Sequence, residues 1–386
     1  MRGTLKQRSK GIWTIILDAG RDPATGKRRQ QWHTVKGTKR EAQKRLTELL
    51  HEVDTGLYIK PAQVTVDTFL RQWLQDYAAN RVRSTTLEGY QWRARSIVAT
   101  LGNIRLADLR PQHIQGYYTD KLSSGIAPLT LVKRHNLIRA ALATAVRWKL
   151  VTANVAELVD PPRKTHKEMR ALTPEEVQEL LDVCQGTPWH TIFHTLVWTG
   201  LRRSELLGLR WKDLDLLLAS LRVTQVLHQL GDGTFVYAEP KTAKGKRAVS
   251  LTPSSCLLLQ VHKEQQEHDA TLLGIQLTGD SLMFSHPDGS PRRPDSLTQA
   301  FRRRSRKAGL TGVGLHDLRH TNASLLLKLN ANPKTISDRL GHAPVQITMD
   351  VYSHLLPSTP GSPGSGRGRP GRFTGTSWDF DLLAKA

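Results

Sequence analysis

A set of polar residues in the last part of the sequence has the side chains that metal-free cleavage of a phosphodiester requires. Such cleavage needs a nucleophile, cations that hold the non-bridging oxygens as charge builds, and an acid that protonates the departing 5′-oxygen. In chain order the set is Arg202, Lys241, His316, Arg319, His342 and Tyr352. Each residue alone is most simply a solvated charge or a packing residue, but the ordered set predicts joint action on one phosphate.

Both arginines lie at helical spacing from a second functional side chain. Glu205 follows Arg202 by three residues, so the carboxylate is expected on the same helical face, where it would support the guanidinium. His316 and Arg319 have the same spacing and would direct an imidazole and a guanidinium at one point. Arginine suits this task because its fork of donors can bind two phosphate oxygens, which lysine cannot do.

Tyr352 is the expected nucleophile. We expect His342 to meet it across a turn at Pro344, and Thr348 to cap a short helix that carries the tyrosine. A tyrosine that attacks phosphorus forms a phosphotyrosyl ester, which keeps the energy of the broken bond. Rejoining would therefore need no ATP.

The acid is expected among the lysines of a hairpin over residues 239–246. Lys241 is the first of them, with Lys244 and Lys246 close behind it. A hairpin tip can enter a minor groove beside the cleaved bond, so any of the three could protonate the leaving oxygen.

The surrounding sequence predicts a multidomain chain that is mainly α-helical with small β elements. The expected parts are a small β-hairpin and helix at 1–60, a helical domain at 64–162, a mixed α+β domain at 168–356, and a flexible basic tail rich in Gly and Pro at 357–386.

The first part alternates apolar and polar residues from Gly11 to Val35 around a turn at 22–26, which predicts a hairpin. Trp13, Ile15 and Leu17 would share one face. A capping box at Thr38 to Glu41 predicts a helix to about Val53, whose buried stripe would be Ala42, Leu46 and Leu49. The hairpin carries Lys27, Arg28 and Arg29, which either face a DNA groove or form a solvated tip.

The second part predicts a series of helices. Phe69, Trp73 and Tyr77 recur every four residues in a helix over 66–79 and are expected to pack in a core. Residues 85–88 predict a further capping box, and Pro111 is expected in a first helical turn. Basic residues that could contact phosphates over one face of this part are Arg81, Arg83, Arg93, Arg95, Arg105, Lys133 and Arg134.

The third part begins where Thr173, Pro174 and Glu176 combine an N-cap, a proline at the first helical position and a capping box. Residues 220–251 are strand-like with turns at 231–233 and 243–245, and the rest predicts helices. In the tail, residues 367–370 are similar to a minor-groove AT-hook but are better explained by disorder.

Composition indicates the partner. The chain of 386 residues has a formal net charge of +22 and a sequence pI near 10.3, an excess that attracts polyanions and favours nucleic acid. Cys184 and Cys256 are too few and too far apart for a disulfide framework or a metal site. No apolar segment suits a membrane span or a signal peptide, so we expect a soluble, intracellular protein without a membrane partner.

Other chemistries lack their signatures. His190 and His194 lie four residues apart, as do His316 and His320, but neither pair has the glutamate and third ligand of a zinc protease. There is no P-loop or dinucleotide fingerprint. We therefore expect no metal and no cofactor.

Four sequence blocks resemble those of the tyrosine recombinase (phage integrase) family, in its three-domain integrase form. The blocks are TGLRRSELLGLRW at 199–211, PKTAKGKRAVSL at 240–251, LHDLRHTNASLLL at 315–327 and LGHAPVQITMDVYSH at 340–354. The resemblance implies that Arg202 and Arg319 clamp the phosphate, with Glu205 supporting the first of them. It implies that Lys241 protonates the 5′-oxygen, that His316 assists proton transfer, that His342 donates to the phosphate and that Tyr352 forms a 3′-phosphotyrosyl link.

The resemblance also implies an organisation and a set of partners. Residues 1–60 would be an arm-type DNA-binding module and 64–162 a SAM-like core-binding domain, with 168–356 catalytic. The protein would act in the bacterial cytoplasm as a homotetramer on double-stranded attachment sites, through a Holliday junction, and would integrate or excise a mobile element such as a phage. An excision factor or a host DNA-bending factor is a possible further partner.

Two other functions are compatible with parts of the pattern. A type IB topoisomerase shares the nucleophile chemistry but relaxes supercoils as a monomer. Asn332-Pro333 between two helical stretches could belong to a helix-turn-helix of a DNA-binding regulator that does not cleave. The regulator leaves the ordered set from Arg202 to Tyr352 unexplained.

Overall fold

The computed structural model describes residues 3–21, 28–54, 64–163 and 169–341. The chain forms two compact units, residues 1–166 and 167–386, and each is described by itself. Helices dominate the described residues and the sheets are small, as the sequence predicted.

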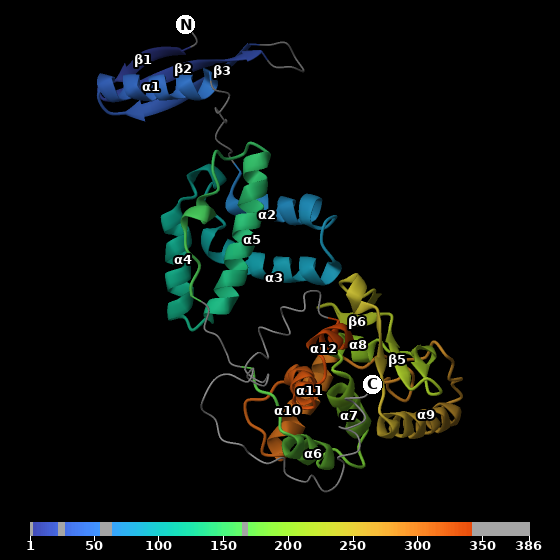
Figure 1. The fold of residues 1–386 in the computed structure, drawn as a ribbon. Coiled ribbons are helices and arrows are strands. Elements are labelled where there is room, and N and C mark those ends of the chain that lie inside the picture. Colours follow the sequence, from blue (N-terminus) through green and yellow to red (C-terminus); the bar gives the residue numbers. More distant parts are fainter. Residues whose placement is uncertain (1–2, 22–27, 55–63, 164–168, 342–386) are drawn as a thin grey trace, which may run out of the picture. The chain divides into compact units, whose positions relative to one another are not determined.

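The N-terminal module is a three-stranded antiparallel sheet with one helix packed on it (Figure 1). Its elements are β1 (Gly3–Ser9), β2 (Ile12–Arg21), β3 (Arg28–Lys36) and α1 (Lys39–Asp54). The predicted hairpin is confirmed as β2 and β3, and β1 pairs with the other edge of β2. Lys27 lies outside the described residues, whereas Arg28 and Arg29 begin β3.

The core of this module lies where the predicted faces meet. Ile15 is fully buried between the sheet and α1, as are Ala42 and Leu49 on the helix. The predicted capping box is confirmed: the Thr38 backbone N–H donates to the Glu41 carboxylate at 2.7 Å, and the Glu41 N–H donates back to the threonine hydroxyl at 3.4 Å.

The helical module has its own aromatic core. Its elements are α2 (Val66–Gln72), the π-helical segment Trp73–Ala78, α3 (Ser84–Leu101), α4 (Pro111–Ser123), α5 (Pro128–Arg147) and the 3₁₀ turns Leu106–Asp108 and Val155–Leu158. Phe69 and Trp73 are buried, and the Trp73 ring stacks on Tyr77 and Tyr90 at centroid distances of 6.0 and 5.8 Å. These rings pack as predicted, and Pro111 opens α4 as predicted.

The capping box predicted at residues 85–88 is wrong. The helix begins at Ser84 with Arg83 as its N-cap and no side-chain cap. The Arg83 carbonyl accepts the backbone N–H groups of Thr86 and Leu87 at 2.9 and 3.0 Å. Because the first helical turn closes on that carbonyl, the threonine at position 85 already lies inside the helix.

The second unit combines helices with two small sheets (Figure 1). Its helices are α6 (Pro174–Asp182), α7 (Trp189–Thr199), α8 (Arg203–Leu207), α9 (Pro253–Leu272), α10 (Pro294–Lys307), α11 (Asp317–Lys328) and α12 (Pro333–Leu340), with 3₁₀ turns at Trp211–Asp213 and Ala243–Gly245. Its strands are β4 (Leu214–Asp215), β5 (Ser220–Val223), β6 (Val226–Gln229), β7 (Phe235–Ala238) and β8 (Arg247–Ser250).

Sequence signals place the first of these helices correctly. The Thr173 hydroxyl accepts the Glu176 N–H at 3.2 Å, and the Glu176 carboxylate accepts the Thr173 N–H at 3.0 Å. Pro174 occupies the first helical position. The first helix of the unit therefore begins at the residue that the capping pattern predicted.

The hairpin predicted over 239–246 is wrong, although the strands on either side of it exist. β7 pairs with β6, whereas β8 pairs with β5, so the intervening residues form a loop that crosses from one sheet to the other. The register places Leu221 opposite Val249, and both are buried in the core. The pairing of β8 with β5 thus buries this apolar pair in the core.

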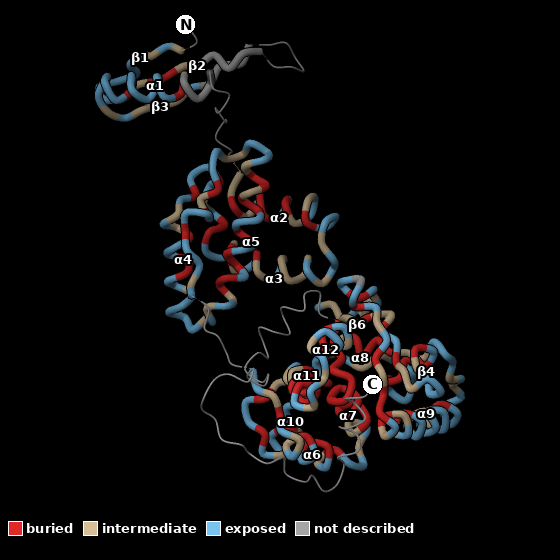
Figure 2. Tube along the Cα trace, in the orientation of Figure 1, coloured by how far each residue is buried: buried red, intermediate tan, exposed pale blue. Residues whose placement is uncertain are grey.

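The core of the second unit centres on α7 and α11 (Figure 2). Every residue of α7 from Thr191 to Thr199 is buried, and so is most of α11. This packing fixes the C-terminal end of α7 and the N-terminal end of α11, where the predicted arginines lie. None of the described helices is long and apolar enough to cross a membrane.

Candidate active site

Arg202 lies at the start of α8, immediately after the turn that ends α7. As the N-cap of α8, it has an extended backbone, and its N–H donates to the Glu205 carboxylate at 2.9 Å. Its guanidinium donates to the same carboxylate at 2.6 Å, and its side chain is 38% exposed. The predicted support of Arg202 by Glu205 is present, and the guanidinium remains open to solvent.

Glu205 is a buried anion, with 2% of its side chain exposed. Burial alone would raise its pKa, but the neighbouring cations Arg247 and Arg202 more than offset that effect and hold the pKa below its usual value. The carboxylate is therefore charged across the physiological pH range. It accepts hydrogen bonds from both Arg202 and Arg247.

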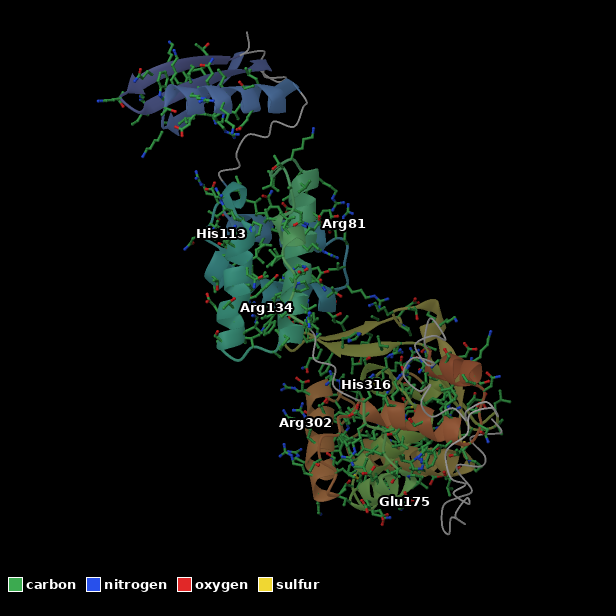
Figure 3. All side chains as sticks on the ribbon, turned by 60° about the vertical axis from the view of Figure 1, so that its left-hand side comes forward. Arg81, His113, Arg134, Glu175, Arg302 and His316 are labelled. Atoms are coloured by element: carbon green, nitrogen blue, oxygen red, sulfur yellow. The ribbon has the colours of Figure 1, made fainter. Side chains whose placement is uncertain are left out.

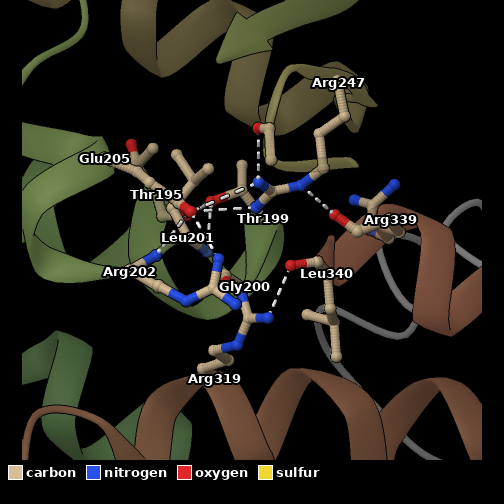
Figure 4. A network of polar contacts seen from close by, with 11 residues as sticks. Thr195, Thr199, Gly200, Leu201, Arg202, Glu205, Arg247, Arg319, Arg339 and Leu340 are labelled. Atoms are coloured by element: carbon tan, nitrogen blue, oxygen red, sulfur yellow. Dashed lines mark hydrogen bonds and ion pairs between the residues drawn. The ribbon is translucent and has the colours of Figure 1, made fainter. Parts of the chain in front are cut away.

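Arg319 lies in the first turn of α11 and is 3% exposed. Its guanidinium donates to the carbonyl oxygen of Gly200 at 2.8 Å and to that of Leu340 (Figure 4). It thereby ties the turn before Arg202 to the end of α12. The two predicted arginines are brought together at these helix ends.

Gly200 makes this approach possible. It has a left-handed backbone with φ of 63°, and a Cβ built there would lie 2.5 Å from Leu340 Cδ2 and 2.8 Å from Asn322 Oδ1. Only glycine tolerates both the conformation and the contacts. The TG that precedes the arginine in the sequence is thus a packing requirement for the site.

His316 is exposed at the N-cap of α11, near both arginines. Partial burial of the ring lowers its pKa, and the positive charges of Arg319 and Arg202 lower it further. Its ring lies edge-on to His320 at a centroid distance of 5.1 Å. For His320 burial, with the charge of His316, lowers the pKa to about 4. Both imidazoles are mainly neutral at pH 7, which suits proton transfer.

The lysine loop, residues 239–246, connects β7 to β8. Lys241 and Lys244 are exposed, and Lys246 forms an ion pair with Glu239 at 2.6 Å. The loop lies next to the end of α12, because a Cβ built on Gly341 would come within 2.9 Å of the Lys244 carbonyl oxygen. His342 and Tyr352 follow that glycine in the sequence and lie outside the described residues.

Sequence reasoning missed Arg247, the first residue of β8. Its side chain is 6% exposed and binds the Glu205 carboxylate with both terminal nitrogens, at 3.0 and 3.3 Å (Figure 4). The two residues are 42 positions apart, so no local spacing signals the pair. Arg339 is half-buried, and it donates to the carbonyls of Trp198 and Ser250 at 3.0 and 2.8 Å.

The candidate DNA contacts of the helical module divide into two groups. Arg81, Arg83, Arg95, Arg105 and Lys133 are exposed and Arg93 is half-buried. Arg134 is 4% exposed and donates to the Tyr117 hydroxyl at 3.2 Å, inside the module (Figure 3). Because Arg134 is part of the core, the prediction that it contacts phosphate is wrong.

A basic helix surface was also missed. Exposed cations near the C-terminal end of α10 are Arg302, Arg303, Arg306 and Lys307, and Arg302 projects outward in Figure 3. The sequence RRRSRK at 302–307 signals this basic surface, but the net charge of the chain alone does not show that these residues share one exposed helix face.

The two histidine pairs, His190 with His194 and His316 with His320, lie on α7 and at the start of α11. His194 is 7% exposed on α7, and burial, aided by the neighbouring His190, lowers its pKa to about 3. Within residues 3–21, 28–54, 64–163 and 169–341, no three His, Cys, Asp or Glu side chains gather as a metal site would require. The two cysteines are free thiols, with Cys184 buried after α6 and Cys256 half-buried on α9.

Comparison with known families identifies the class. Residues 170–358 match the phage integrase family, and residues 65–122 match the N-terminal SAM-like domain of phage integrases. The chain belongs to the phage integrase family and is a tyrosine site-specific recombinase.

Relatives agree over most of the chain. It is 28% identical to the ICEBs1 integrase of Bacillus subtilis (strain 168) over 365 residues, which cover 92% of this chain and 96% of the relative. It is 24% identical to a XerC-like tyrosine recombinase of Caldanaerobacter subterraneus, covering 90% and 93%.

Solved structures share the fold. The Tn1549 transposon integrase in complex with a circular intermediate DNA matches with a TM-score of 0.66 at 21% identity, over 75% of this chain and 95% of that one. A lambda integrase tetramer bound to a Holliday junction matches with a TM-score of 0.55 at 19% identity, over 92% and 94%.

Proposed function

We propose that this recombinase integrates a mobile element into a bacterial chromosome and excises it again, and that the residues around Gly200 hold the scissile phosphate. The observation that carries the proposal is the convergence of Arg202 and Arg319 at the ends of α7, α8, α11 and α12. Two guanidinium groups at one place form a site for a single phosphodiester. The integrase relatives support the choice of a mobile element as the substrate.

Each side chain has a role in the proposed reaction. Tyr352 attacks phosphorus, a 3′-phosphotyrosyl ester forms, and the bond to the 5′-oxygen breaks. Arg202 and Arg319 stabilise the charge that builds on the non-bridging oxygens. His342 donates a hydrogen bond to the phosphate, and His316 assists proton transfer. Lys241 gives its proton to the departing 5′-oxygen. In the second half, the 5′-hydroxyl of another strand attacks the ester and releases the tyrosine.

Lys241→Ala is expected to slow cleavage, because the 5′-oxygen then leaves without its acid. A substrate with a bridging sulfur at the 5′ position should recover much of the rate, since a thiolate leaves without protonation. The measurement is the single-turnover cleavage rate on matched 5′-oxygen and 5′-sulfur DNA.

Lys244→Ala and Lys246→Ala are the matched controls from the same loop. They should cleave both substrates at rates near those of the unchanged protein. Recovery by sulfur in Lys246→Ala instead would move the acid to that residue, which the ion pair with Glu239 holds in the present structure.

The other modules are proposed to bind the DNA around the cleavage point. Exposed cations of the helical module and of α10 would contact phosphates, and the N-terminal sheet would bind separate sites. We further propose that the protein works as a homotetramer on paired sites in the bacterial cytoplasm, with an excision or host bending factor selecting the direction. The lambda tetramer on a Holliday junction supports this assembly.

The test of function uses the purified full chain with two DNAs that carry the element's flanking sequences, without metal or ATP. Joined recombinant DNA is the expected product. Relaxation of supercoils without joining would indicate a topoisomerase, and salt-sensitive binding without strand breakage would indicate a regulator. Either outcome overturns the proposal.

A further inference from the structure

Arg247 occupies a central place in the polar network although it is not among the residues expected to touch DNA. It binds the same buried carboxylate as Arg202, so that Glu205 Oε1 accepts from both guanidinium groups and Oε2 accepts from Arg247 (Figure 4). Both contacts of Arg247 are made by terminal nitrogens, in the parallel geometry that makes arginine–carboxylate pairs strong. Its side chain is almost fully buried, so solvent screens the pair little.

The position of Glu205 weakens the positive charge that the site can offer to a phosphate. A carboxylate at 2.6 Å from Arg202 cancels much of the positive field that this arginine could offer to a phosphate. Arg202, Arg319, Arg247 and Glu205 together carry a net charge of two. Without Arg247 the net charge falls to one, and Glu205 is left with Arg202 as its partner.

Arg247 also joins the loops that surround the site. Its Nε donates to the carbonyl of Arg339 near the end of α12, and its Nη1 donates to the Gly245 carbonyl at 3.2 Å in the lysine loop. A Cβ built on Gly341 would lie 3.0 Å from Nη1. One side chain thus contacts the arginine support, the lysine loop and the end of α12.

We propose that Arg247 is a positioning residue that neutralises Glu205, so that Arg202 can use its positive charge on the scissile phosphate. The inference rests on the proposed role of Arg202. It adds a further residue to the machinery of the reaction, one that acts through Glu205 and does not touch the DNA.

The test compares two substrates that differ in the charge of the scissile group. A methylphosphonate replaces one non-bridging oxygen with a methyl group, so the group is neutral and needs less positive charge to react. Arg247→Met is expected to slow single-turnover cleavage of ordinary DNA by up to about 10²-fold, the loss that follows when one donor, here Arg202, no longer stabilises the reacting group. On methylphosphonate DNA the loss should shrink to a few-fold.

A second variant separates charge from shape. Glu205→Gln combined with Arg247→Met removes the carboxylate that Arg247 neutralised, so cleavage of ordinary DNA should be faster than in Arg247→Met alone. Arg247→Lys keeps a charge but not the two-pronged contact and should lie between the unchanged protein and Arg247→Met. Thermal unfolding of each variant gives the folded fraction to which rates are normalised.

Arg210→Met is the matched control, because Arg210 pairs with the buried Asp213 at 3.1 Å elsewhere in the same unit. It should lose stability without a difference between the two substrates. If Arg247→Met cleaves as fast as the unchanged protein, or slows equally on both substrates, the inference is overturned. Failure of the unchanged protein to cleave either substrate would instead overturn the proposed function.

Discussion

Tyr352→Phe is expected to abolish the covalent joining of protein to DNA while leaving DNA binding intact. The change removes one oxygen atom, and with it the nucleophile of the proposed reaction, but keeps the ring and its packing. The measurement is to mix the protein with supercoiled DNA that carries its element's flanking sequence, without metal or ATP, and to stop the reaction with detergent. Protein bound to DNA is then counted on a denaturing gel.

Tyr237→Phe is a suitable control, because Tyr237 is a 47% exposed residue of β7 and loses the same hydroxyl. Its adduct should equal that of the unchanged protein. An adduct that persists in Tyr352→Phe would show that another side chain is the nucleophile. No adduct in any variant, with tight binding, would leave a regulator as the better explanation.

The second large effect is expected at Arg319. Arg319→Ala should reduce the single-turnover cleavage rate on the order of 10²-fold or more, because a donor to the developing charge is lost. It should also lower stability, since the carbonyls of Gly200 and Leu340 lose a buried charged donor. Each carbonyl left without a partner costs about 1–3 kcal/mol.

Arg319→Lys distinguishes the two effects. Lysine keeps the charge but cannot present two donors to one phosphate, so cleavage should remain well below that of the unchanged protein even where unfolding is little changed. Rates are taken at a temperature where thermal unfolding shows each variant to be folded. Cleavage by Arg319→Ala within a few-fold of the unchanged rate would exclude this arginine from the phosphate site.

Local signals in the sequence predicted a large part of this structure. The caps at Thr38 and Thr173, the proline at position 111 and the spacing of Arg202 from Glu205 all depend on residues within one helical turn of each other. Such patterns specify geometry directly, because the helix fixes the distance between its members.

Apart from the capping box at residues 85–88, which α3 replaces by starting at Ser84, the errors concern contacts between residues distant in sequence. The pair of Arg247 and Glu205, the burial of Arg134 against Tyr117 and the pairing of β8 with β5 all depend on how elements meet in space. An arginine looks the same in sequence whether it is solvated or paired with a buried acid. The lysine loop was expected to be a hairpin because a turn between two strands usually joins neighbours.

The true topology of that loop has a consequence for how the protein can vary. Since its two ends belong to different sheets, no ladder of hydrogen bonds runs along the loop, and its length is not tied to any strand register. Doubling the length of a flexible loop costs only about 0.6 kcal/mol in closure entropy. Insertions or deletions ahead of Lys244 can therefore change the reach of Lys241 while both sheets stay as they are, whereas the contacts of Gly245 with Arg247 and of Lys244 with Gly341 hold the second half of the loop.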